Sequence, residues 1–284
     1  LPELNAGAHI DLKLSNGLSR QYSLMTGLHN PNYWRIAVLI ERDGRGGSLL
    51  IEKELQVGSE ISSVGPRNHF PLTPAGEYLF VAGGIGITPL LRMIDTAQLQ
   101  GIPWKLAYLG RSPETMTYVS ELQQQFGNQV DVFAKSLGDR IQVTREISEL
   151  NTQTHIYSCG PERLMLALEE AMGATDINRI HVERFHPREI VLDEPDHEFT
   201  VYCSKSDEEI IVPADESILM AADFAGIDIP GDCMEGTCGA CETRVFEGEV
   251  DHRDSVLSAQ ARAEGDTMMI CISRAKGKRL VIDL

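Results

Sequence analysis

Residues 233–241 read Cys-Met-Glu-Gly-Thr-Cys-Gly-Ala-Cys, and a further cysteine, Cys271, follows later in the chain. The C-x4-C-x2-C spacing with a distant fourth cysteine is that of plant-type 2Fe-2S sites. Two irons bridged by two sulfides need four thiolates, and one tight loop can place three. The interleaved glycines let the backbone fold closely around a cluster and turn N–H groups toward its sulfurs. The motif therefore predicts a 2Fe-2S centre, which handles electrons singly, held by Cys233, Cys238, Cys241 and Cys271.

Zinc and disulfides are the two alternative uses of these cysteines. Zinc sites usually combine one C-x2-C pair with a second short pair, and only one such pair is present here. Disulfides are rare inside cells, and no charged and then apolar leader opens the sequence. The iron centre is therefore favoured, and it leaves Cys159 and Cys203 as free thiols.

Length and charge limit the possible functions. A chain of 284 residues and 31.4 kDa exceeds one ferredoxin-sized module and predicts two or three domains. Residues 1–188 carry 17 Lys and Arg against 20 Asp and Glu (net −3), whereas residues 189–284 carry 8 against 22 (net −14). This acidity argues against nucleic acid as a partner. It would attract a protein with a basic docking patch, and the alternative is that the charge only keeps the protein soluble. No apolar run reaches the roughly 20 residues of a membrane span, so a cytoplasmic protein is expected.

The amino-terminal part predicts a small antiparallel β-barrel. Runs that alternate apolar and polar residues lie at 8–14, 20–25 and 34–41, and more strand-like sequence follows near 57–64. Clusters of Gly, Asn, Ser and Pro separate these runs. The barrel is expected over residues 1–73.

From residue 77 onward, short apolar strands alternate with amphipathic helices, which indicates a parallel α/β sheet. Residues 186–197 contain two prolines and many charges, and are expected to form a linker. A hairpin and a helix then precede the cysteine loop, the order of a β-grasp ferredoxin. The α/β domain is thus expected at 74–185 and the ferredoxin at 198–284. The expected strands are 77–83, 104–110, 130–135 and 154–159, and the expected helices are 89–101, 117–126 and 161–173.

Residues 82–89 read AGGIGITP and join the first of these strands to its helix. Gly83, Gly84 and Gly86 would let the backbone approach a pyrophosphate, and the helix N-terminus offers unpaired N–H groups and a positive dipole end. A plain tight turn is the alternative. The spacing differs from the G-x-G-x-x-G of doubly wound dehydrogenases, so a nucleotide site in another fold is predicted.

The tripeptide Cys159-Gly160-Pro161 ends another strand at the carboxyl edge of the sheet, where α/β proteins bind ligands. A thiol there could lie beside a nicotinamide, which makes Cys159 a candidate catalytic residue. The alternative is a small buried hydrophobe. Arg111 follows the second strand and could meet a 2′-phosphate or stack on adenine, so the sequence alone does not choose between NADH and NADPH.

A flavin is expected between nucleotide and cluster. Hydride carries two electrons and the cluster accepts one, so an intervening group must hold a pair and release it singly. Arg20, Tyr22 and Ser23 lie on one predicted strand in the pattern R-x-Y-S. Barrels of the ferredoxin reductase superfamily hold flavin by this pattern, although Tyr22 could also be an ordinary strand aromatic.

The remaining motifs point to one family. They are Arg45-Gly46-Gly47-Ser48, Pro66-Arg67-Asn68-His69-Phe70-Pro71-Leu72, Tyr157-Ser158-Cys159-Gly160-Pro161, His181-Val182-Glu183-Arg184-Phe185 and the closing segment 251–279. Together with R-x-Y-S, the AGGIGITP turn and the cysteines, they resemble the phthalate dioxygenase reductase family over nearly the whole chain. Barrels of this family usually begin with another strand before the position of Ala8. Either the amino end is therefore expected to be cropped or disordered, or the barrel edge is expected to be filled differently.

The resemblance implies a flavin barrel, an NADH domain and a ferredoxin in that order, serving a Rieske-type terminal oxygenase. It implies FMN rather than FAD, and NADH as the electron donor. Ser23 and Cys159 are the candidate catalytic residues. The implied FMN contacts are Arg20, Tyr22 and Ser23 at ring and phosphate, Gly47 and Ser48 around the phosphate, and Thr88 and Phe185 against the isoalloxazine. The implied NADH contacts are Gly83, Gly84, Gly86, Arg111, Cys159, Gly160 and Pro161.

Two other functions remain open from the sequence. The same three modules, in other orders, serve diiron or haem oxygenases. The chain could also be a passive electron carrier, or a binding module stabilised by a structural zinc. In either case the first two domains would serve only as scaffolds. Flavin bands together with sulfide-to-iron charge transfer would distinguish the reductase from a colourless zinc protein.

Overall fold

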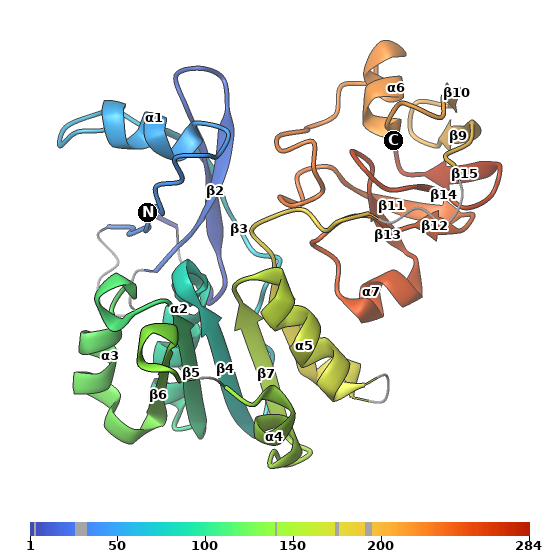
Figure 1. Cartoon of the computed structure of the whole chain (residues 1–284). Helices are drawn as coiled ribbons and strands as arrows, with labels where there is room; N and C mark the ends of the chain where they lie inside the picture. Colours follow the sequence, from blue (N-terminus) through green and yellow to red (C-terminus); the bar gives the residue numbers. More distant parts are fainter. Residues whose placement is uncertain (3, 26–32, 140, 174–175, 191–194) are drawn as a thin grey trace. The chain divides into compact units, whose positions relative to one another are not determined.

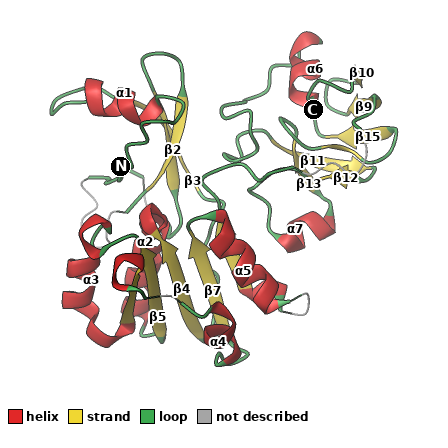
Figure 2. Cartoon of the chain, in the orientation of Figure 1, coloured by secondary structure: helices red, strands yellow, loops and turns green. Residues whose placement is uncertain are grey.

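The computed structural model describes residues 1–2, 4–25, 33–139, 141–173, 176–190 and 195–284. The chain divides into two units, Leu1–Glu183 and Arg184–Leu284 (Figure 1), and each is considered by itself. Figure 2 shows that both units contain helices as well as strands. Within the described ranges, no helix has the length and apolar character needed to cross a bilayer.

The first unit opens with a three-stranded antiparallel sheet in the order β2-β1-β3. Paired residues of neighbouring strands share a face, so Tyr22 lies beside Ile10 and Arg20 beside Leu12 on the side of the apolar core. Ser23 points to the opposite face, because side chains alternate along a strand. The elements are β1 (His9–Lys13), β2 (Ser19–Ser23), β3 (Ser62–Arg67) and one helix, α1 (Gly47–Glu54).

The prediction of a strand over residues 34–41 is wrong. Trp34 and Ile36 do pack against the apolar core, as their alternation indicated, but the segment joins no strand in the described part of the chain. Alternation reports which side chains face inward, and it does not establish a hydrogen-bonded partner strand. The strand expected near 57–64 begins only at Ser62, and α1 is an addition that begins inside the Arg45-Gly46-Gly47-Ser48 motif.

The rest of the first unit is a five-stranded parallel sheet in the order β6-β5-β4-β7-β8. The strand order reverses between β4 and β7, so the carboxyl ends of these two strands frame the point where such sheets bind ligands. The strands are β4 (Glu77–Gly83), β5 (Trp104–Gly110), β6 (Val130–Ala134), β7 (Thr154–Cys159) and β8 (Ile180–Glu183). The helices are α2 (Ile87–Gln100), α3 (Val119–Phe126), α4 (Val143–Ser148) and α5 (Glu162–Met172), with 3-10 turns at Gly84–Gly86, Pro113–Thr115, Gly127–Gln129, Lys135–Leu137 and Ile177–Arg179.

Helices cover both faces of this sheet (Figure 1). Tyr78 and Phe80 of β4 pack with residues of α2 and α3, whereas Leu79 and Val81 pack with residues of α4 and α5. Burial on both faces explains the continuous apolar strands of the sequence. The parallel α/β sheet is therefore confirmed, and α4 is an addition to the expected helices.

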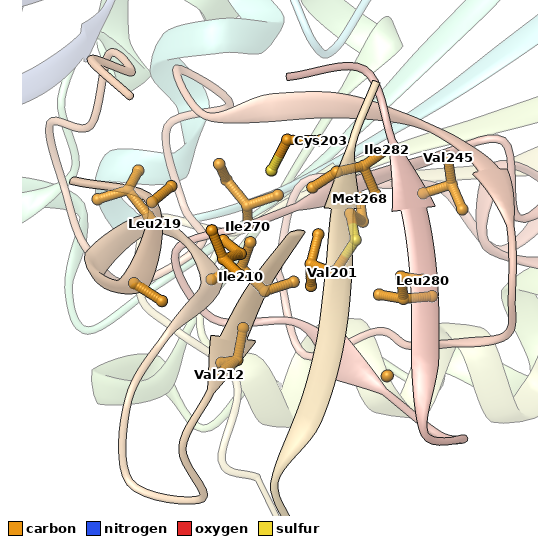
Figure 3. Packing of buried hydrophobic residues seen from close by; sticks show 14 of the residues in the cluster. Val201, Cys203, Ile210, Val212, Leu219, Val245, Met268, Ile270, Leu280 and Ile282 are labelled. Atoms are coloured by element: carbon orange, nitrogen blue, oxygen red, sulfur yellow. The ribbon is translucent and has the colours of Figure 1, made fainter. Parts of the chain in front are cut away.

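The second unit is built on a mixed five-stranded sheet in the order β10-β9-β15-β11-β13, with a separate β12-β14 pair. Strands β9 and β10 form an antiparallel hairpin, and β15 runs parallel to β9. Leu219 of α6 belongs to the same buried apolar cluster as Val201 and Ile282 of the sheet (Figure 3), which is the β-grasp arrangement expected. The elements are β9 (Phe199–Cys203), β10 (Glu208–Val212), α6 (Ile218–Phe224), β11 (Glu242–Glu247), β12 (Val250–Asp251), α7 (Ala259–Glu264), β13 (Thr267–Met269), β14 (Arg274–Ala275) and β15 (Arg279–Ile282).

The segment expected to be a linker makes contacts within the second unit. The backbone N–H of Arg188 donates to Ser255 Oγ at 3.0 Å. Asp196 accepts from the guanidinium of Arg253, with Nη1 and Oδ2 3.0 Å apart. The domain boundaries at residues 73, 185 and 197 stay predictions, and the first residue of the second unit is Arg184.

Candidate functional site

The cysteine loop between α6 and β11 contains no helix or strand over residues 231–241. Its backbone turns through the left-handed region at Met234 (φ 57°), Gly236 (φ 66°) and Gly239 (φ 72°). Two of these three positions are glycine, the residue that enters this region without a steric penalty. The glycines of the motif are therefore needed to fold the loop back on itself.

The four predicted ligands are brought together. Hydrogen bonds from Cys238 and Cys271 hold the pKa of Cys233 well below its usual range, and a hydrogen bond with Cys271 lowers the pKa of Cys241. Cys238, Cys241 and Cys271 are buried, and Cys233 is half-buried. Four thiols within mutual reach in a largely buried loop form a donor set that suits an iron–sulfur cluster.

Backbone N–H groups of the loop already point at the sulfurs. The amides of Glu235 and Thr237 both donate to Cys233 Sγ at 3.4 Å. The amide of Ala240 donates to Cys238 Sγ at the same distance. Such bonds stabilise the thiolates and tune the potential of a cluster that they hold.

Arg20 and the start of α1 form an anion cradle in the first unit. A Cβ placed on Gly47 would lie 2.7 Å from Arg20 Nε, so the guanidinium lies directly against the first turn of the helix. Gly46 has φ 82° and the helix has no side-chain cap. Within the part of the chain that the structure describes, Arg20 Nη2 is buried without a hydrogen-bond partner. Ser48 Oγ accepts a backbone N–H, so its own hydrogen can still donate. These residues fit a phosphate group.

The residues expected around the flavin ring have the following positions. Burial raises the pKa of Tyr22, whose ring packs at the edge of the apolar core. Ser23 is buried on the opposite face of β2. Thr88 is buried and its hydroxyl donates to Ile85 O at 3.0 Å. Phe185 belongs to the second unit and is 41% exposed, so its contact with a flavin stays a prediction, as do those of the other three.

The two nucleotide turns predicted from the sequence touch each other. A Cβ placed on Gly86 would collide with the carbonyl of Cys159, and one placed on Gly83 would collide with Pro161. A Cβ on Gly160 would lie 2.8 Å from Gly83 Cα. Backbone packs directly on backbone here, which explains why glycine is needed at these positions. The structure thus joins the ends of β4 and β7 into one rigid edge.

Tyr108 is a further residue of this site that sequence reasoning missed. It is fully buried on β5, and its hydroxyl lies 3.1 Å from the carbonyl oxygens of both Gly84 and Thr117. Burial raises the pKa of Tyr108, so the hydroxyl stays a donor. The sequence signal that could have identified it is a tyrosine in the middle of a predicted buried strand, because a buried hydroxyl needs a hydrogen-bond partner.

Cys159 lies at the rigid edge but is fully buried. Burial, together with the carboxylate of Glu183, its neighbour on β8, raises the pKa of Cys159 well above the usual value. The group is therefore a neutral thiol rather than a thiolate nucleophile. Glu183 has a buried Oε2 to which no described residue donates a hydrogen bond, and burial raises the pKa of Glu183 to about 8. Arg111 is exposed one strand away, after β5.

The comparisons with known proteins agree with these sites. The family described as the 2Fe-2S iron-sulfur cluster binding domain matches residues 201–276. The chain is 37% identical to the carnitine monooxygenase reductase subunit of Escherichia coli (strain K12), over 100% of this chain and 90% of that protein.

Solved structures that are similar along the whole chain include the following two. Phthalate dioxygenase reductase, described as a modular structure for electron transfer from pyridine nucleotides to [2Fe-2S], has a TM-score of 0.69 and 34% identity, over 100% of this chain and 89% of that one. An intact type IV self-sufficient cytochrome P450 monooxygenase has a TM-score of 0.92 and 44% identity, and the chain spans 37% of its length. The chain therefore belongs to the phthalate dioxygenase reductase family, as a flavin-dependent iron–sulfur oxidoreductase that serves an oxygenase system.

Proposed function

We propose that this chain accepts hydride from NADH and delivers single electrons, by way of FMN and the 2Fe-2S cluster, to a Rieske-type terminal oxygenase in the cytoplasm. The observation that carries the proposal is the buried Arg20 Nη2 at the uncapped start of α1, which has no hydrogen-bond partner among the described residues. Leaving such a donor unsatisfied is costly, so the cradle is expected to hold an anion. The phosphate of FMN has the right charge, and the same unit contains the nucleotide turns.

Each part of the FMN site has a separate task in this proposal. Arg20, Gly47 and Ser48 bind the phosphate, and Tyr22 packs against the ring. Ser23 would donate a hydrogen bond to the ring, and Thr88 and Phe185 would line it. Bound flavin supplies the conversion of electron pairs into single electrons. The protein groups themselves orient the ring and exclude water.

The nicotinamide nucleotide is proposed to lie across the rigid edge formed by the two turns. Gly83, Gly84 and Gly86 offer close backbone approach for its phosphates at the start of α2. Cys159, Gly160 and Pro161 would flank the nicotinamide, with the neutral Cys159 thiol as a packing and orienting group. Arg111 would contact the adenosine end, and NADH is favoured over NADPH because the family prefers it.

Two kinds of oxygenase compete as the electron acceptor. A Rieske partner is proposed from the resemblance to the phthalate dioxygenase reductase family, because the order of flavin, nucleotide and ferredoxin modules recurs in the self-sufficient P450 and does not separate the two. A haem oxygenase is the second candidate, supported by the similarity to the self-sufficient P450. Both candidates accept single electrons, so the cofactor sites of this chain are compatible with either.

Loading and spectroscopy test the electron path. Protein reconstituted with FMN, iron and sulfide should contain one flavin and one two-iron cluster, and NADH should bleach the flavin before the cluster in stopped flow. An Arg20→Ala variant should bind FMN at least tenfold more weakly, the equivalent of about 1.4 kcal/mol. Wild-type protein that takes up neither flavin nor acid-labile sulfide would refute the path.

Acceptor choice separates the two partners. Rates of NADH-driven reduction would be measured with a purified Rieske oxygenase and with a P450 haem domain, each at several ionic strengths. Faster reduction of the Rieske centre supports the proposal. Faster reduction of the haem would contradict the proposal and indicate that the partner is a haem oxygenase.

A further inference from the structure

One peptide of the cysteine loop is hydrogen-bonded at both of its ends. The carbonyl of Gly236 accepts from the backbone N–H of Ser255 at 2.8 Å. The N–H of the same peptide, on Thr237, donates to Cys233 Sγ at 3.4 Å. In a trans peptide the C=O and N–H are fixed in one plane and point in opposite directions. Holding the carbonyl therefore aims the N–H at the ligand sulfur.

Asp254 orders the turn that presents this Ser255 amide. Its side chain is completely buried, and Oδ1 accepts from the amides of Val256 at 2.9 Å and Leu257 at 2.7 Å. Arg262 Nη2 donates to the carbonyl of Asp254 at 2.6 Å and lies 3.6 Å from Oδ1. These contacts fix the backbone on both sides of residue 255.

The same turn packs directly on the loop. A Cβ placed on Gly236 would lie 2.9 Å from Asp254 Cα and 2.6 Å from Ile272 Cγ2. Ile272 follows the fourth ligand, Cys271. Gly236 therefore packs between the Asp254 turn and the segment that contains Cys271. Neither surface leaves space for a side chain at this position.

We propose that Asp254 is a positioning residue for the cluster, which sets the reduction potential by holding the Ser255 amide against Gly236. Two effects of opposite sign follow. The N–H···S bond that it maintains stabilises the reduced, more negative cluster and raises the potential. Its buried carboxylate opposes added negative charge and lowers the potential. The inference rests on the proposed function only in requiring a bound cluster, whichever oxygenase is served.

Two substitutions separate these effects in the full-length, cluster-loaded protein. Asp254→Asn retains Oδ1 as an acceptor but removes the charge, so its EPR g values should match the wild type while its potential rises. A tenfold change in the ratio of reduced to oxidised cluster is expected, which is about 59 mV for one electron. Asp254→Ala also loses the acceptor, so its g values should shift and its potential should fall below that of Asp254→Asn.

Matched controls come from the same segment. Asp251→Asn removes a carboxylate that binds Arg253 and lies outside the cysteine loop, and Ser255→Ala retains the backbone N–H. Both should have wild-type spectra and potentials. Equal potentials and g values in Asp254→Ala and Asp254→Asn would overturn the proposal. If Asp254→Ala does not take up iron, Asp254→Glu tests the positioning role instead, because it retains the charge but alters the turn. A wild-type spectrum and potential in Asp254→Glu would overturn this role.

Discussion

The helices of the two units begin in different ways. The described helices of the first unit, α1 to α5, have no side-chain cap, and α1 and α2 each follow a glycine. In the second unit, Ser217 caps α6 and Ser258 caps α7, each with Oγ 3.1 Å from a backbone N–H. A capping hydroxyl satisfies donors that could otherwise bind phosphate. The starts of α1 and α2 thus keep amides that could bind the anions proposed for the first unit, whereas the cofactor expected in the second unit would be held by thiols.

The largest effect is expected from removing a thiol. Cys238→Ser should abolish NADH-driven reduction of cytochrome c, a one-electron acceptor, because the cluster loses a ligand. Flavin reduction by NADH should remain at the wild-type rate, since it depends on the first unit. Stopped-flow absorbance follows both steps. Cys203→Ala, at a buried thiol outside the loop, is the control, and simultaneous loss of both steps in Cys238→Ser would contradict two centres in series.

Acid should destabilise the first unit through a buried histidine. Burial, with smaller effects of His69 and Arg67, lowers the pKa of His9 to about 4 from 6.5. A lowered folded pKa gives stability that is present above about pH 6.5 and lost as the pH falls toward 4. The loss should reach about 3 kcal/mol by pH 4. Urea titrations at pH 7 and pH 4.5 should show a smaller loss in His9→Gln than in the wild type, with His197→Gln as the control; equal losses in all three would contradict this origin.

Backbone contact should make the nucleotide edge sensitive to a single methyl group. In Gly86→Ala the new Cβ collides with the carbonyl of Cys159, so the two turns must separate. A displacement of about 1 Å can slow a positioned reaction roughly 100-fold, and this loss is expected for flavin reduction by NADH. Gly277→Ala is the matched control, since nothing lies within 4 Å of its Cβ. A wild-type rate in Gly86→Ala would show that the edge need not be rigid.

The smallest effect is expected from a helix cap. Ser258→Ala should destabilise the second unit by about 1 kcal/mol, because the amide of Ala261 loses its acceptor. Ser258→Asp should restore most of this stability. Denaturation followed by the visible absorbance of the cluster measures both variants, and flavin reduction should not change in either. No difference between alanine and aspartate would mean that the cap contributes nothing.

The sequence predicted those parts of the fold that are encoded over short distances. The cysteine spacing identified the four thiols, and the continuous apolar strands identified the parallel sheet, because both signals lie within local stretches. The prediction of a strand over residues 34–41 was wrong, because alternation shows which side of a segment faces the core but not whether a partner strand lies beside it. The Arg20 and Gly47 contact agrees with the motif, whereas Tyr108 and Asp254 required the structure, since their partners come from other elements.

The hydrogen bond from Arg188 to Ser255 bears on the construction of chimeric reductases. Arg188 donates its backbone N–H to Ser255 of the ferredoxin part, and the backbone N–H of Ser255 also donates to the cysteine loop. A junction placed after residue 197, as the charged and proline-containing sequence suggests, would graft a foreign segment onto this contact. A junction directly after Glu183 would transfer the segment with its own ferredoxin, and is the better place to exchange modules.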